Sequence, residues 1–123
     1  MEAKDFMLND FVHSKLHNVD TQILDIEGGS YNSVWLTNKE CWERHYMNEI
    51  EPISLTKDIL YKNFPDTLGN VYWEWDDEKS NEEENWYEFS ISSKNVKVNM
   101  TIRYVHELQH ALRLCGIEKE IEL

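Results

Sequence analysis

The chain has 123 residues, 41% of them hydrophobic and 12% aromatic, a length that fits one domain or two tightly packed subdomains. This composition is rich enough in apolar side chains to form a core, which excludes a wholly disordered chain. Acidic residues outnumber basic ones by 24 to 12, and the formal net charge of −12 argues against direct binding to nucleic acid or to an anionic membrane surface.

The sequence contains no apolar run of the roughly 20 residues needed to cross a bilayer. Near the start, Glu2 and Asp5 stand where a signal peptide would carry basic residues. We therefore expect a protein of the host-cell cytoplasm. The two cysteines, Cys41 and Cys115, are expected to be reduced, with Cys115 filling a core position.

Four short strands are expected in the first part of the chain, at residues 10–16, 19–27, 31–37 and 45–53. They are rich in β-branched and aromatic residues, and the dipeptides His17-Asn18 and Gly28-Gly29 predict turns between them. The apolar alternation in 19–27 is imperfect, which we interpret as a strand covered on both faces. Several short strands so close together predict an SH3-like small β-barrel or curled sheet over residues 1–54.

A short helix is expected next. Thr56 is a suitable N-cap, Asp58 lies in the first turn, and Pro65 ends the helix after about two turns.

The second part of the chain alternates again, which predicts strands at 71–75, 86–92 and 95–102 in a three-stranded antiparallel meander. A final helix over 103–115, stopped by Gly116, is expected to pack one apolar side on the sheet. The fold class is therefore α+β, with an α-β-β-β-α subdomain at 55–123 that joins the barrel-like part in one compact unit.

The final helix contains His106-Glu107-Leu108-Gln109-His110, a match to the zinc-peptidase pattern HExxH, in which two histidines hold zinc and the glutamate acts as the base. A third ligand is lacking, and both histidines are expected to point from the apolar side into solvent, away from any walled cleft. We therefore assign no metal, cofactor or catalytic residue, and keep a zinc peptidase as an alternative.

The same helix side carries a secondary basic face, formed by Arg103, His106, His110 and Arg113. This face is suited to dock an acidic loop of its own chain, a second copy, or a small anionic ligand.

The most biased segment is the acidic connection, which lies between strands rich in aromatic residues. The candidate binding residues are its carboxylates and the exposed members of the neighbouring aromatics: Asp76, Asp77, Glu78, Glu82, Glu83, Glu84, Tyr72, Trp73, Trp75 and Trp86. Such a row can imitate the phosphates and bases of a nucleic acid. The alternatives are a solvated turn that protects a sheet edge, and a calcium site, which the missing EF-hand spacing disfavours.

The segments Ile50-Glu51-Pro52-Ile53-Ser54-Leu55-Thr56 and Tyr104-Val105-His106-Glu107-Leu108-Gln109 resemble an IEPIxLT segment and a C-terminal YVHxLQ helix of small uncharacterised phage and prophage proteins of Bacteroidetes. In those proteins a histidine at the position of His110 is not required, which argues against a zinc pair. The resemblance also implies a mobile-element setting, in which a counter-defence role is plausible.

These observations predict a non-enzymatic acidic binding protein, an inhibitor of anti-CRISPR or anti-restriction type. Its expected partner is a basic, nucleic-acid-binding host defence protein such as an RNA-guided nuclease, a CRISPR effector. A phage structural or regulatory interaction module is a further alternative, and the oligomeric state is left open.

Overall fold

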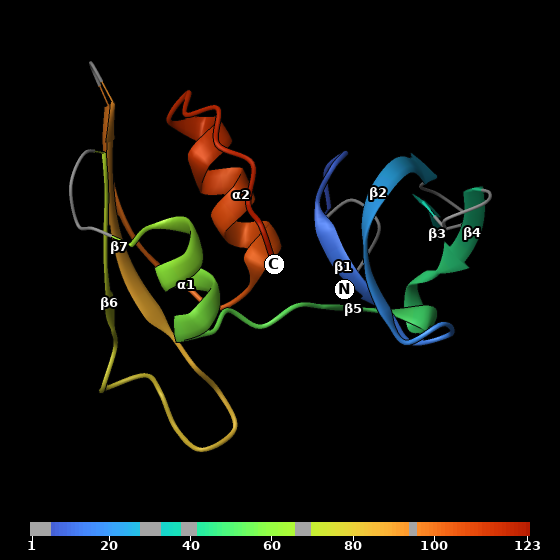
Figure 1. The fold of residues 1–123 in the computed structure, drawn as a ribbon, viewed down its shortest axis with the longest axis horizontal. Helices are drawn as coiled ribbons and strands as arrows, with labels where there is room; N and C mark the ends of the chain where they lie inside the picture. The colour runs from blue at the N-terminus through green and yellow to red at the C-terminus, as the bar shows by residue number, and fades with distance from the viewer. Residues whose placement is uncertain (1–5, 28–32, 38–41, 66–69, 94–95) are drawn as a thin grey trace. The chain divides into compact units, whose positions relative to one another are not determined.

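The computed structural model describes residues 6–27, 33–37, 42–65, 70–93 and 96–123. The chain divides into two compact units, Met1–Ile53 (unit 1) and Ser54–Leu123 (unit 2). The described residues form two α-helices and eight strands, in an antiparallel sheet of five and a sheet of three (Figure 1). The fold class is α+β, as expected.

Unit 1 holds the five-stranded sheet, whose strand order is β4-β3-β2-β1-β5. Its strands are β1 (Phe11–Ser14), β2 (Val19–Glu27), β3 (Ser33–Thr37), β4 (Trp42–Tyr46) and β5 (Ile50–Pro52). The inner face carries the core of unit 1, formed by Phe6, Val12, Ile23, Val34, Leu36 and Ile50.

This sheet is strongly curled. Ser14 Oγ on β1 lies 2.9 Å from His45 Nε2 on β4, although β2 and β3 separate these strands in the sheet. The sheet does not close into a barrel within the described residues, because β4 and β5 are its two edges.

The interpretation of the imperfect alternation in β2 needs correction. The pairing of β2 with β3 shifts between Ile23 and Asp25, which indicates a β-bulge. A bulge adds one residue to one strand and so changes which side chains face inward. Thr21 and Ile23 are buried before the shift, and Ile26 packs on the core after it.

The prediction of one continuous strand over 45–53 is also wrong. A 3-10 turn at Met47–Glu49 separates β4 from β5. The Glu49 carboxylate accepts a hydrogen bond from the Tyr46 backbone N–H at 2.9 Å, which satisfies a donor that a continuous strand would have paired. The first strand is shorter than the expected 10–16, and the Gly28-Gly29 turn and Cys41 lie outside the described residues.

Unit 2 begins with α1 (Lys57–Asn63). Thr56 caps it as expected, because its side chain accepts a hydrogen bond from the Ile59 N–H at 3.2 Å.

The expected meander is confirmed in β6 (Val71–Trp75), β7 (Tyr87–Ser93) and β8 (Val96–Ile102), which are antiparallel neighbours in that order. The helices α1 and α2 (Val105–Leu114) lie on one side of this sheet (Figure 1). Five side chains on that inner face are buried: Val71, Tyr87, Phe89, Ile91 and Ile102.

The end of α2 also agrees with the expectation. Gly116 follows it with a φ of +72°, a conformation that favours glycine. Cys115 is buried, as predicted for a core position. Neither helix of the described residues combines the length and the hydrophobicity that a bilayer-spanning helix needs.

Candidate functional site

The acidic connection between β6 and β7 is held in place by its own side chains. Asp76 is buried, and its Oδ1 accepts hydrogen bonds from the backbone N–H groups of Glu78 and Lys79 at 3.0 and 3.1 Å. Asn81 Oδ1 accepts two more, from Glu83 and Glu84, at 2.8 and 2.9 Å. The connection is therefore an ordered turn structure in which Asp76 has a structural role.

A further pair of bonds closes this connection. Ser80 Oγ accepts a hydrogen bond from the Trp86 N–H at 2.9 Å and lies 3.2 Å from the Trp86 carbonyl oxygen, to which it donates. The Asp76 N–H also donates to the Trp86 carbonyl, at 2.9 Å. These bonds join the two ends of the connection.

Four of the predicted carboxylates are exposed at the surface of this turn: Asp77, Glu78, Glu82 and Glu83. Within the described part of the chain, none of the four forms an ion pair with lysine or arginine. We call these four residues the acidic loop.

Glu84 and Trp86 are engaged inside the unit. Glu84 Oε1 pairs with Arg103 Nη2 at 3.3 Å, and the Trp86 indole N–H donates to Glu84 Oε2 at 3.2 Å. The Arg103 guanidinium also lies 5.7 Å from the centre of the Trp86 ring. Three partners were left open for the basic face: an acidic loop of its own chain, a second copy, or an anionic ligand. Arg103 pairs with an acidic residue of its own chain.

The predicted aromatic residues divide between the two faces of the sheet. Tyr72 is exposed on the outer face, and Trp75 is exposed with Lys57 Nζ 4.9 Å from its ring centre. Trp73 is half-buried and packs edge-to-face against Tyr61 and Tyr87. The exposed members of the predicted set are thus Tyr72 and Trp75.

Sequence reasoning missed two carboxylates on the outer face of this sheet. Glu74 on β6 and Glu88 on β7 are direct cross-strand partners, and both are exposed. A hydrogen bond with Glu74 and the nearby charge of Asp76 raise the pKa of Glu88, because like charges disfavour the ionised form. Glu74 lies two positions after Tyr72, and Glu88 two positions before Ser90; residues at this spacing share a face of a strand, which was the sequence signal for the pair.

The outer face is slightly hollowed at this pair. A shallow pocket of about 310 Å³ is lined by polar side chains of all three strands, including Tyr72, Glu74, Glu88, Ser90, Asn99 and Thr101. The Tyr72 hydroxyl donates to Glu74 Oε2 at 3.3 Å, so this face presents carboxylates beside an exposed phenol ring.

The HExxH residues of α2 have local structural partners. Glu107 Oε1 accepts hydrogen bonds from the backbone N–H groups of Arg103 and Tyr104, at 3.2 and 3.0 Å. This carboxylate therefore caps the helix N-terminus, which counts against its use as a catalytic base.

The expectation that both histidines point into solvent is wrong for His106. His106 is 3% exposed, since its ring stacks on Tyr104 at 5.8 Å and meets His110 edge-to-face at 5.6 Å. The ring of the N-cap residue Tyr104, two positions earlier, thus stacks on a residue that the helical wheel placed opposite the apolar side.

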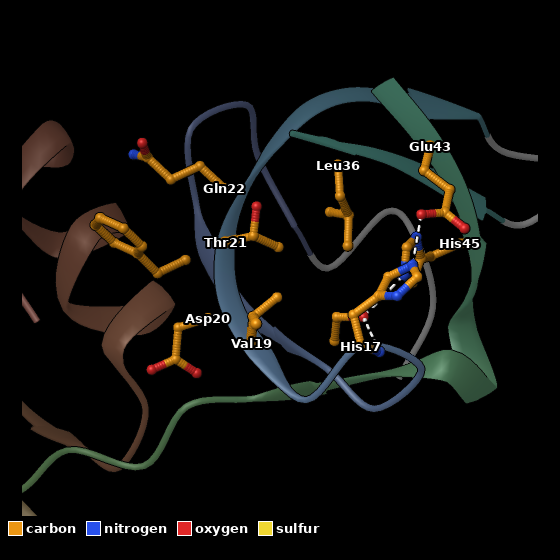
Figure 2. Close-up of a pocket in the computed structure, with 10 residues that line it drawn as sticks. His17, Val19, Asp20, Thr21, Gln22, Leu36, Glu43 and His45 are labelled. Carbon is orange, nitrogen blue, oxygen red and sulfur yellow. Dashed lines mark hydrogen bonds and ion pairs between the residues drawn. The ribbon is translucent and has the colours of Figure 1, made fainter. Parts of the chain in front are cut away.

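Unit 1 contains a pocket of about 710 Å³. Figure 2 shows Glu43 pointing toward the rings of His17 and His45 at one side of this pocket. His17 Nε2 lies 2.5 Å from Glu43 Oε2, and the two imidazole rings meet edge-to-face at 5.6 Å. Sequence reasoning singled out none of these three residues.

Strand pairing explains why polar groups line this pocket. Glu43 and His45 of β4 pair with Leu36 and Val34 of β3, both of which are core residues. Side chains directly opposite each other lie on the same face of a sheet, so β4 carries Glu43 and His45 on the core face of unit 1. Their i, i+2 spacing is the sequence signal that was available.

A scan of protein-family models and searches of curated proteins and of solved structures found no match to this chain.

Proposed function

We propose that this chain is a non-enzymatic binding protein whose acidic loop docks onto a basic surface of another protein. The observation that carries the proposal is the ordered turn that holds Asp77, Glu78, Glu82 and Glu83 outward without lysine or arginine partners among the described residues. Because Asp76 and Asn81 already fix the turn, little conformational entropy is lost on binding.

The outer face of the β6–β8 sheet extends the proposed interface. The Glu74–Glu88 pair places like charges directly opposite each other, an arrangement that destabilises a sheet. A cationic partner would remove this repulsion on binding. The exposed Tyr72 ring adds an amphipathic contact of the kind enriched in protein interfaces.

The proposed partner is a basic, nucleic-acid-binding protein. A surface that binds phosphates presents lysine and arginine to closely spaced negative charges. Ordered carboxylates near an aromatic ring resemble the phosphates and bases that such a surface binds. Together with the resemblance to phage and prophage proteins, this favours an inhibitor of a host defence protein, such as an RNA-guided nuclease, acting in the host cytoplasm. We also propose that the curled sheet of unit 1 is SH3-like.

The test is capture of the tagged chain from a nuclease-treated lysate of its bacterial host, followed by mass spectrometry. We expect one basic nucleic-acid-binding protein near equimolar recovery. The double variant Glu82→Lys, Glu83→Lys should reduce this recovery by more than about tenfold, because a charge-paired interface loses attraction and gains repulsion.

The matched control is Glu118→Lys, Glu120→Lys, which changes the net charge equally at exposed residues outside the loop. Unchanged recovery with this control supports the loop as the interface. Equal loss in both double variants would mean that only bulk charge attracts the partner, and an empty capture would contradict the proposal. Self-association in solution would favour the structural-module alternative.

A further inference from the structure

The pocket of unit 1 brings together three side chains that are distant in the sequence. His17 lies in the turn after β1, whereas Glu43 and His45 come from β4. One ligand atom from each residue lies within 4.8 Å of the other two. Figure 2 shows that the three side chains converge on one side of the pocket.

His45 supplies a second, independent observation. The residue is 1% exposed, and its Nδ1 has no hydrogen-bond partner in the described part of the chain. Its other ring nitrogen, Nε2, lies 2.9 Å from Ser14 Oγ. A buried ring nitrogen without a hydrogen-bond partner or a ligand lowers the stability of the fold.

Ser14 is placed to orient this imidazole. With the proton of His45 on Nε2, that nitrogen donates to Ser14 Oγ, which also accepts a hydrogen bond from the His17 backbone N–H at 3.2 Å. Metal-binding histidines commonly donate their second N–H to such an acceptor, which fixes the ring and the tautomer. Ser14 thus holds the side chain of His45 and the backbone of His17.

We propose that His17, Glu43 and His45 bind a divalent transition-metal ion, with zinc as the best fit. Two imidazoles and one carboxylate form a ligand set that suits zinc, whereas magnesium and calcium prefer oxygen ligands alone. With three protein ligands, a four-coordinate zinc ion would keep one position for water.

The spacing needs only small adjustment for this ion. Zinc bonds of about 2.1 Å place tetrahedral ligand atoms about 3.4 Å apart. His17 Nε2 and Glu43 Oε2, now 2.5 Å apart and joined by a proton, separate when the ion replaces that proton. His17 and Glu43 are on the accessible side of the cluster, with side-chain exposures of 41% and 33%, so a rotamer change at either residue meets less packing than one at buried His45.

The test is zinc titration of the purified full-length chain after treatment with a chelator, by calorimetry and by elemental analysis of dialysed protein. We expect one zinc ion per chain and no binding of magnesium. His17→Ala and Glu43→Gln should each weaken zinc binding by more than about tenfold, since even loss of an outer-shell partner costs roughly 10- to 100-fold. Both variants change accessible residues, and circular dichroism checks that they fold.

Two histidine variants serve as controls. His13→Ala removes a ring that pairs with Asp20 and Asn18 outside the cluster, and His110→Ala removes the second histidine of the HExxH pattern. Both should retain zinc. Loss of zinc in His110→Ala alone would assign the ion to α2, and absence of stoichiometric zinc in the unaltered chain would overturn the proposal.

Discussion

At the scale of single residues, two glutamates experience opposite electrostatic environments. The pKa of Glu88 is raised by its hydrogen bond with Glu74 and by the nearby charges of Asp76 and Glu78. The pKa of Glu27 is lowered, chiefly because Glu27 accepts a hydrogen bond from the Trp35 indole and also interacts with Arg44. Folding therefore favours the protonated form of Glu88 and the ionised form of Glu27.

We predict that Glu88→Gln raises the Tm at pH 7. A raised pKa stabilises the folded state fully below the ordinary value of 4.5, and this contribution is lost as the pH rises through the folded-state pKa. The gain from glutamine should therefore disappear near pH 3, where Glu88 is protonated. Thermal unfolding followed by circular dichroism at both pH values measures the difference.

Glu27→Gln is the control of opposite sign. A lowered pKa contributes stability above its ordinary value, and that contribution is lost as the pH falls through the folded-state pKa. Glu27→Gln should accordingly lower the Tm at pH 7, and this effect should shrink as the pH falls toward the lowered pKa of Glu27. A Glu88 variant that lowers the Tm at pH 7 would contradict the repulsion inferred across β6 and β7.

At the scale of elements, the C-terminal segment is an integral part of unit 2. Asn63 at the end of α1 donates to the carbonyl oxygens of Ile59 and Glu122 at 2.8 and 2.7 Å, and its Oδ1 accepts from the Glu122 N–H at 2.8 Å. Ile121 beside it is 3% exposed. One amide side chain thus joins the helix end to a segment that has no regular structure of its own.

We predict that Asn63→Ala lowers the free energy of unfolding by about 1–3 kcal/mol, because the part-buried backbone N–H and carbonyl groups of Glu122 lose their hydrogen-bond partner. Urea denaturation measures this change. Lys62→Ala is the matched control: Lys62 donates to the Leu123 carbonyl at an exposed position, where a substitution should change stability by no more than about 0.5 kcal/mol. Equal effects in the two variants would show that the buried amide has no special role.

At the scale of the whole molecule, the net charge of −12 acts in two directions. Repulsion among carboxylates destabilises the folded state, and the same field attracts a basic partner from a distance. Salt screens both effects, since the Debye length falls from about 30 Å at 0.01 M to about 8 Å at physiological ionic strength.

We therefore predict that raising the NaCl concentration from about 20 to about 500 mM, which shortens the Debye length about fivefold, increases the Tm and decreases recovery of the captured partner. Thermal unfolding and quantitative capture at each concentration measure the two responses. Recovery that does not fall with salt would indicate an interface formed by apolar contacts, and would count against the acidic loop.

Local chemistry determined much of the fold from sequence. Thr56 and Gly116 mark helix boundaries through a side-chain cap and a positive φ, both of which depend on a few neighbouring residues. The three strands of the meander were predictable because their alternation is uninterrupted. The acidic loop was likewise visible, since a run of carboxylates between strands is exposed in nearly any fold.

Only the tertiary structure decided the features that depend on long-range pairing. The bulge in β2 and the turn at Met47–Glu49 redirect strands in ways that alternation alone does not predict. Packing also turned Trp73 inward, buried His106 beneath Tyr104, and paired Glu84 with Arg103. His17 and Glu43 are 26 residues apart, and they meet because the sheet curls. Side-chain convergence of this kind depends on strand order, register and curvature, which local sequence does not specify.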